Sequence, residues 1–294
     1  MLRSTLFIPG DSEKKLSKAG TVGADGIIID LEDSIAENRK PLAREMVREY
    51  LTNTDVTNTE FWIRCNPIDD PQTMLDLAAV VPAAPAGIVL PKAEGPEDVI
   101  RCSHCLDVLE AEHGVEAGSV GILSVATETA KAVFGLNAYQ NVRPERLRGL
   151  TWGAEDLGSA VGASSNMTDG GEWTDPYRMV RSLCLFAAYA ADTQAVDTVY
   201  VNFKDDDGLR RVCNEARRDG FTGKMAIHPA QVAIINEAFT PSAAEVEHAE
   251  TVVRLFAENP EAGTIGHEGQ MLDKPHLTQA ERILNLAARV KAMA

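Results

Sequence analysis

Eight short apolar segments recur along the chain, and each is followed by a polar turn and a longer segment with helical periodicity. The apolar segments span residues 4–8, 26–30, 60–64, 86–90, 120–124, 147–152, 196–201 and 223–227. The helical segments between them span residues 12–22, 41–51, 71–81, 95–112, 129–139, 173–192, 205–219 and 229–239. Nearly continuous apolar strands that alternate with amphipathic helices are typical of a parallel sheet covered by helices. Because eight such units close a TIM (β/α)8 barrel, this is the α/β fold that we predict.

The last part of the chain carries two further helix signals and no ninth strand. Ser242 with Glu245 has the pattern of a capping box, and Thr278 with Glu281 has it again. A glycine-bearing loop, too short to be a domain, separates the two predicted helices. We therefore predict a catalytic barrel over residues 1–240 and a C-terminal helical extension over residues 241–294.

Composition excludes several classes of protein. The 28 basic and 44 acidic residues give a net charge of −16 without a long basic run, so we expect no nucleic-acid partner. No segment approaches about 18 continuous apolar residues, and we expect no membrane partner. Five cysteines and an N-terminus without a signal-peptide core favour reduced thiols in a cytoplasmic protein. Cys102 and Cys105 form a C-x-x-C motif, but without a second ligand pair they fit one face of a helix better than a metal site.

Charged residues gather where the predicted strands end, which is where a TIM barrel places its functional residues. They are Glu32, Asp33, Arg64, Lys92, Glu128, Glu155 and Asp156. Buried carboxylates need a positive partner, and Mg²⁺ commonly takes one or two protein carboxylates. We therefore predict that Glu128 and one member of the Glu155/Asp156 pair hold a divalent metal. The alternative is that these acids cap the helices that follow them.

Several longer motifs extend this pattern across nearly the whole chain. LFIPGDSEKKLSKA, GADGIIIDLEDSIAENRKPLAR, IRCNP, VLPKAEGPEDV, TETAKAV and WGAEDLGSAVGA resemble the citrate lyase β-subunit-like family of acyl-CoA lyases. The resemblance implies a TIM barrel assembled as a homotrimer or a dimer of trimers. It also implies dependence on Mg²⁺, with Mn²⁺ as a substitute. The implied reaction is reversible cleavage of a 3-hydroxyacyl-CoA thioester to an acyl-CoA and a 2-oxo acid.

The same resemblance implies a role for individual residues. Glu128 and Asp156 are the implied magnesium ligands, and Arg64 is the implied ligand of the oxo acid. Glu32 and Asp33 are placed around the water shell of the metal, and Gly153 and Ala154 are placed beside the substrate. Glu155 becomes a capping or supporting partner. The residue that accepts the hydroxyl proton stays open, with a water near Glu32 as our suggestion.

The segment GQMLDKPHL resembles the tail of malyl-CoA and citramalyl-CoA lyases. In that subgroup an aspartate, here Asp273, closes over the barrel of a neighbouring subunit as the acid/base. The tail favours free coenzyme A over a carrier-protein thioester. From its residue type alone, Asp273 also fits a solvated loop that precedes a helix starting near Pro275.

The other residues with chemical potential have two interpretations each. Lys14, Lys15 and Lys18, with Arg3 nearby, fit either a site for the coenzyme A phosphates or a solvated helix face. Barrel or helix-entry packing is a sufficient explanation for His228, Trp152 and Phe7.

The predicted function is thus a lyase for a malyl-CoA, methylmalyl-CoA or citramalyl-CoA type of thioester, with glyoxylate or pyruvate as the oxo acid. Malate-synthase-like condensation, malyl-CoA thioester hydrolysis, and action on a carrier-protein thioester as a citrate lyase β-subunit are the alternatives within the family. A metal-dependent pyruvate aldolase and a non-catalytic scaffold are more distant alternatives. The motifs do not decide between substrates that differ by one methyl group.

Overall fold

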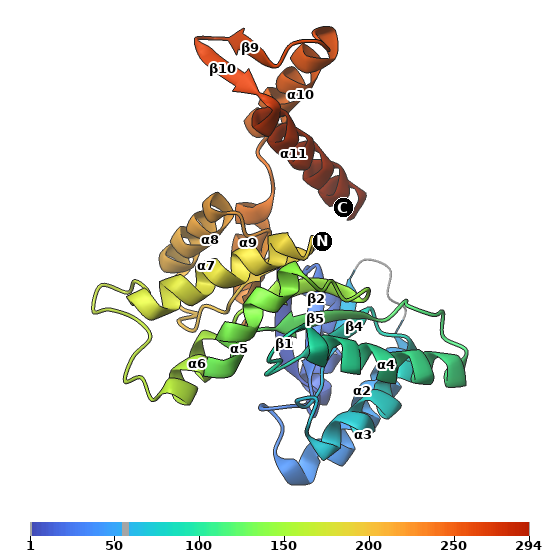
Figure 1. Ribbon diagram of the computed structural model, residues 1–294. Coiled ribbons are helices and arrows are strands. Elements are labelled where there is room, and N and C mark those ends of the chain that lie inside the picture. Colours follow the sequence, from blue (N-terminus) through green and yellow to red (C-terminus); the bar gives the residue numbers. More distant parts are fainter. Residues whose placement is uncertain (1, 55–58, 294) are drawn as a thin grey trace. The chain divides into compact units, whose positions relative to one another are not determined.

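A computed structural model describes residues 2–54 and 59–293 of the chain. The chain divides into two compact units, Met1–Asn236 and Glu237–Ala294. The first unit contains the barrel, and the second contains a helical hairpin with a small sheet (Figure 1).

Eight parallel strands form a closed barrel in sequence order, which confirms the predicted fold. The strands are β1 Ser4–Pro9, β2 Gly26–Asp30, β3 Glu60–Arg64, β4 Gly87–Leu90, β5 Gly121–Val125, β6 Leu147–Thr151, β7 Gln194–Asp197 and β8 Gly223–Ala226. The barrel closes through β1 and β8, where Ser4 pairs with Lys224 and Leu6 pairs with Ala226. All eight carboxyl ends therefore open on the same side of the barrel.

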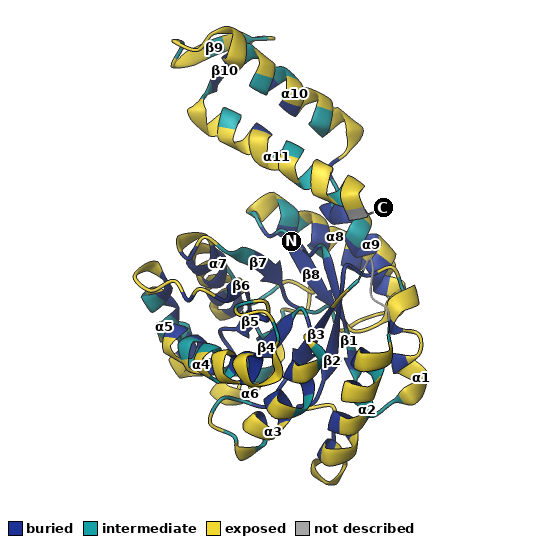
Figure 2. Cartoon of the chain, turned by 90° about the vertical axis from the view of Figure 1, so that its right-hand side faces the viewer, coloured by how far each residue is buried: buried dark blue, intermediate teal, exposed yellow. Residues whose placement is uncertain are grey.

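Helices surround these strands, and Figure 2 shows buried strands inside helices whose outer faces are exposed. The helices are α1 Glu13–Leu16, α2 Lys40–Asn53, α3 Pro71–Val80, α4 Pro96–His113, α5 Ala130–Gly135, α6 Ala154–Val161, α7 Asp175–Ala190, α8 Asp206–Asp219 and α9 Pro229–Phe239. This arrangement explains the continuous apolar strands, because each strand is covered on both faces. Ile27, Ile28 and Ile29 of β2, for example, are all fully buried.

The interior of the barrel is packed with side chains from alternate strand positions. The cluster consists of Leu2, Ile28, Trp62, Val89, Leu123, Val125, Val196 and Met225. Trp62 fills so much of this space that a Cβ on Gly87 would lie 2.3 Å from its ring. The barrel is thus a solid core, and only the ends of its strands are available for chemistry.

Within the first unit, the predicted elements differ from the structure at the seventh strand, at residues 12–22 and at α6. The seventh strand ends at Asp197 and not at residue 201, and Val201 is exposed beyond it. Residues 12–22 contain the four-residue helix α1 and a separate 3-10 turn at Ala19–Thr21. The helix α6 was not predicted. It is only eight residues long, and it ends at Gly162, which adopts a left-handed conformation.

The second unit pairs α10 Ala243–Glu258 with α11 Lys274–Met293. The capping box of Ser242 and Glu245 is confirmed at the start of α10. The one proposed for Thr278 and Glu281 is wrong, since Thr278 lies inside α11 and its hydroxyl donates to the carbonyl of Lys274.

The expected loop of this unit contains the antiparallel hairpin of β9 Thr264–His267 and β10 Gln270–Asp273. Among the described residues, no helix combines the length and the apolar character that a membrane span requires.

Candidate active site

An ion pair between neighbouring strands anchors the site. Asp30 ends β2, Arg64 ends β3, and the two residues are in register. Arg64 donates from Nε and Nη2 to the two carboxylate oxygens of Asp30, each at 2.7 Å. Burial alone raises the pKa of Asp30, but the hydrogen bonds and charge of Arg64 outweigh it and leave the pKa below its ordinary value. Asp30 was absent from the predicted site, although a strand-end acid in register with a strand-end arginine was a usable signal.

Arg64 is held from two further directions. Its Nη1 lies 3.0 Å from Oε2 of Glu32, and its guanidinium carbon lies 5.0 Å from the centre of the Phe7 ring. Burial alone lowers the pKa of Arg64. The hydrogen bonds to Asp30 and the charges of Asp30 and Glu32 outweigh this effect, so the pKa is raised above its ordinary value. The guanidinium therefore stays charged and fixed in direction. Phe7 packs against the barrel core, as expected, and in addition its ring lies against the guanidinium.

Glu32 is buried between two cations, with 3% of its surface exposed. The ammonium of Lys92 contacts Oε1, while Arg64 faces Oε2. Lys92 also lies 3.1 Å from Asp33, whose side chain is more exposed. Burial raises the pKa of Glu32, and the charges of Arg64 and Lys92 offset this only in part.

Glu128 follows β5 and is the most perturbed acid of the site. The residue is 3% exposed, and its carboxylate accepts a 2.5 Å hydrogen bond from the backbone N–H of Lys92. Burial and then the nearby charge of Asp156 raise the pKa of Glu128 to about 8. Asp156 lies in the first turn of α6, so the structure brings together the two acids that the sequence predicted as partners.

Side-chain capping does not account for these two acids, although Asp156, in the first turn of α6, still fits the helix-dipole part of that alternative. The side-chain cap of α5 is Thr129, which accepts from the N–H of Ala132, and α6 has no side-chain cap. Glu155 is exposed and accepts a 2.7 Å hydrogen bond from Nδ2 of Asn166. Glu128 and Asp156 are therefore available for another role, whereas Glu155 belongs to a surface contact.

Gly153 makes room for the Glu128 side chain. A Cβ at this position would lie 2.5 Å from Cγ of Glu128 and 3.3 Å from its Oε1. The N–H of Gly153 donates to Oγ1 of Thr127 at 3.1 Å, and Ala154 then begins α6. A role for Gly153 and Ala154 in substrate binding remains a prediction.

A buried acid beside a second, partly exposed acid suits a hard dication. Within residues 2–54 and 59–293, no group of three or more His, Cys, Asp or Glu side chains is arranged as a metal site. Glu128 and Asp156 provide two carboxylates, which matches Mg²⁺, since this ion usually keeps several waters. The donor set and its charge therefore fit magnesium.

The lysines of α1 and Arg3 do not form one group. Lys14, Lys15 and Lys18 are exposed on and just after α1, beyond the carboxyl end of β1. Arg3 lies before β1 and forms a 2.7 Å ion pair with Asp25, which precedes β2. Its expected proximity to the lysines is wrong, because it lies at the opposite end of the strands.

His228 and Trp152 have the packing roles that were expected for them. Nδ1 of His228 accepts from the N–H of Ala230 at the entry to α9, and its ring stacks on Phe203. The buried indole of Trp152 donates to Asp197 at 2.7 Å.

In the second unit, Asp273 is the last residue of β10, and α11 begins at the next residue. The expectation of a loop acid is thus wrong, since the hairpin fixes its backbone. Nδ1 of His276 lies 2.5 Å from Oδ1 of Asp273.

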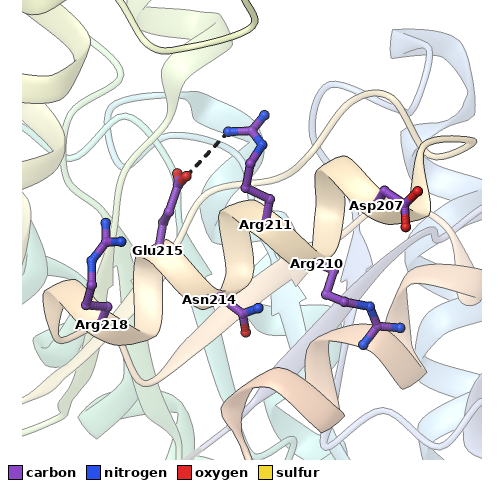
Figure 3. A pocket seen from close by; sticks show the side chains of 6 residues that line it. All are labelled: Asp207, Arg210, Arg211, Asn214, Glu215 and Arg218. Carbon is purple, nitrogen blue, oxygen red and sulfur yellow. Dashed lines mark hydrogen bonds and ion pairs between the residues drawn. The ribbon is translucent and has the colours of Figure 1, made fainter.

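An open pocket on the surface of α8 is separate from these groups (Figure 3). It is lined by Asp207, Arg210, Arg211, Asn214, Glu215 and Arg218. Arg211 and Glu215 form an ion pair at 3.4 Å. No predicted site residue lines this pocket.

Comparison with known proteins gives the family. Residues 3–229 match the HpcH/HpaI aldolase/citrate lyase family, and residues 177–290 match a carbon–carbon bond lyase family of the TIM-barrel fold. The chain is 33% identical to the mitochondrial citramalyl-CoA lyase of Mus musculus, over 98% of this chain and 87% of the relative. It is 34% identical to a (3S)-malyl-CoA thioesterase of Cereibacter sphaeroides, over 99% and 96% of the two chains.

A solved structure agrees with these relatives. CitE from Mycobacterium tuberculosis, in complex with magnesium, acetoacetate and coenzyme A, superposes with a TM-score of 0.78 and 33% identity over 97% of each chain. The chain therefore belongs to the HpcH/HpaI aldolase/citrate lyase family, whose members among its relatives include carbon–carbon lyases.

Proposed function

We propose that this chain is a magnesium-dependent acyl-CoA lyase of the citramalyl-CoA, malyl-CoA or methylmalyl-CoA type. It cleaves a 3-hydroxyacyl-CoA reversibly to an acyl-CoA and a 2-oxo acid, either pyruvate or glyoxylate. The observation that carries the proposal is the buried Glu128 carboxylate beside Asp156, on the same side of the barrel as the fixed Arg64 guanidinium. The relatives and the magnesium-bound and coenzyme-A-bound CitE structure support it.

Glu128 and Asp156 would hold Mg²⁺, with Mn²⁺ as a substitute. When bound there, the ion supplies Lewis acidity toward the hydroxyl and carboxylate of the substrate. Both carboxylates must be ionised to hold it, and the raised pKa of Glu128 makes this step depend on pH.

Arg64 binds the carboxylate of the oxo-acid portion in this proposal. Its direction is set by Asp30 and Phe7, so little side-chain freedom is lost on binding. In the cleavage direction the substrate hydroxyl loses its proton. Glu32, which lies beside Arg64, orients this hydroxyl or accepts its proton. Oε2 of Glu32 accepts no hydrogen bond from the described residues, although Arg64 lies 3.0 Å away.

The electron pair of the broken carbon–carbon bond passes to the thioester enolate, while the former hydroxyl carbon becomes a carbonyl. Asp273 then donates a proton to the enolate carbon, and it removes that proton in the condensation direction. In this proposal Asp273 comes from a neighbouring subunit of a homotrimer or dimer of trimers, with residues 241–294 as the extension that carries it. Lys14 binds a coenzyme A phosphate, while Asp33, Gly153 and Ala154 border the substrate.

The test is a product assay with purified protein and MgCl2. Citramalyl-CoA, malyl-CoA and methylmalyl-CoA are supplied separately, and pyruvate or glyoxylate is measured together with the acyl-CoA. Glu128→Gln is the matched control, because it keeps the size of the side chain and removes its charge. Absence of a 2-oxo acid from all three thioesters would refute the proposal.

Thioester hydrolysis is a second candidate, because one relative is named (3S)-malyl-CoA thioesterase. The same assay separates the two reactions. A lyase releases an acyl-CoA with the oxo acid, whereas a thioesterase releases free coenzyme A and the intact hydroxy acid.

A further inference from the structure

Lys92 has an unusual backbone for its position. Its φ is 52°, in the left-handed region that favours glycine. Among the described residues, the other non-glycine residues with positive φ are Ala84, Asp192 and Glu268, and all three are exposed. Lys92 instead lies between the buried residues Pro91 and Ala93, directly after β4. This conformation therefore has to be maintained by contacts within the site.

The first contact is made by the main chain. The N–H of Lys92 donates to Oε2 of Glu128, and within the described ranges no other group donates a hydrogen bond to this carboxylate. The direction of this N–H depends on the backbone conformation of Lys92. The left-handed turn thus fixes one oxygen of the acid that we assign to the metal.

The second contact is made by the side chain. The ammonium of Lys92 contacts Oε1 of Glu32 and lies 3.1 Å from Oδ2 of Asp33. Glu32 is nearly fully buried, and it faces Arg64 with its other oxygen. The ammonium therefore holds Glu32 in place as a neighbour of Arg64 instead of leaving it free to turn toward a metal.

We propose that Lys92 is a positioning residue that connects the two halves of the site: its left-handed main chain orients Glu128, and its ammonium orients Glu32. This inference rests on the proposed function, because it treats Glu128 as a metal ligand. The two contacts use different parts of the residue, so substitutions separate them.

The main-chain contact is tested by Lys92→Gly and Lys92→Val. Both variants lose the ammonium, but glycine adopts φ near 52° readily while a β-branched residue does not. We expect Lys92→Val to bind Mn²⁺ about 10- to 100-fold more weakly than Lys92→Gly, measured by titration calorimetry on the full metal-free chain. Ala84→Gly and Ala84→Val are the matched controls, since Ala84 has φ 48° on the surface. This control pair changes Tm but leaves Mn²⁺ affinity unaltered.

The side-chain contact is tested by Lys92→Met and Lys92→Arg. Methionine keeps much of the length without the charge, so we expect kcat to fall about 10- to 100-fold while Mn²⁺ affinity does not fall. Arginine keeps the charge and restores most of kcat. A residue that only stabilises the fold would instead lower Tm and would leave kcat per folded molecule unchanged.

Each result decides the inference. Equal Mn²⁺ affinity for Lys92→Gly and Lys92→Val would overturn the main-chain role, and wild-type kcat in Lys92→Met would overturn the ammonium role. If Lys92→Val does not fold, the methionine and arginine variants still decide the second role, and Lys92→Ala replaces valine for the first. Failure of the wild-type chain to bind Mn²⁺ would overturn the proposed function as well.

Discussion

Gly153→Ala tests the Glu128 site with the smallest possible change. Gly153 has φ −107° and ψ 100°, which alanine adopts without strain, so the substitution acts through its added methyl group alone. That methyl carbon would lie 2.5 Å from Cγ of Glu128, about 1 Å short of ordinary contact at 3.4–4 Å. Glu128 must therefore move, because Gly153 is fixed by its N–H bond to Thr127.

The expected effect follows from this displacement. A misplacement of about 1 Å in a catalytic group can cost about 100-fold in rate, and overpacking costs about 1–3 kcal/mol of stability. We expect Gly153→Ala to lower kcat/KM by about 100-fold, to weaken Mn²⁺ binding by about 10-fold and to lower Tm by a few degrees. The rates come from the product assay with Mg²⁺, and the affinity comes from calorimetry on the metal-free chain.

Gly20→Ala is the matched control, since an added Cβ there meets no atom within 4 Å. A double variant with Glu128→Asp and Gly153→Ala gives a second check, because the shorter acid needs less of the space. We expect Gly153→Ala to cost the Glu128→Asp variant less than it costs the wild type. If Gly153→Ala keeps both Mn²⁺ affinity and kcat/KM within the error of the wild type, Glu128 does not act where the structure places it.

Three further predictions concern pH, the second unit and the barrel wall. Because the pKa of Glu128 is raised from 4.5 to about 8, its contribution to the stability of the metal-free chain is present below pH 4.5 and is lost as pH rises through 8. Urea titrations with and without Mg²⁺ check this, and a metal effect that does not grow toward pH 8 would contradict it. Asp273→Asn lowers kcat about 100- to 10,000-fold without weakening Mn²⁺ binding. If Asp273 acts across subunits, mixing the Asp273→Asn protein with the Glu128→Gln protein restores activity. Asp197→Asn lowers the free energy of unfolding by about 3–5 kcal/mol, because the buried ammonium of Lys224 loses its charge partner. In the wild type this ammonium lies 2.8 Å from the Asp197 carboxylate. An unchanged urea denaturation curve would refute this prediction.

The sequence predicted the barrel because burial on both faces of a parallel strand leaves a clear pattern. Ile27, Ile28 and Ile29, for example, are apolar at three successive positions, which is typical of a strand covered on both sides. The positions of Arg64, Glu128 and the Glu155/Asp156 pair followed from the same reasoning, since strand ends converge at one end of a barrel. The choice of Asp156 over Glu155 came from the family resemblance alone.

Other features depend on contacts that no local pattern contains. Lys92 in its left-handed turn contacts Glu128 and Glu32, which lie far away in the sequence. The hairpin before α11 was missed because its short strands are mostly exposed and lack apolar alternation. Of the eight residues in these two strands, Leu272 is the one that is buried, in the core of the second unit. The side-chain pair of Asp273 and His276 likewise became apparent only with the helix start at Lys274.

The order of charges around the barrel shows why Glu128 and Asp156 are the place where we propose a dication. From β2 to β4 each acid has a basic neighbour: Asp30 and Glu32 face Arg64, and Glu32 also faces Lys92. Glu128 comes next, beside Lys92, and the alternation breaks after it, where Asp156 is a second acid whose charge raises the Glu128 pKa. Like charges in a buried position are unfavourable unless a cation or a proton separates them. A dication at the proposed site would restore the alternation, and the nearby Arg64 could then bind an anionic substrate in a chain whose net charge is −16.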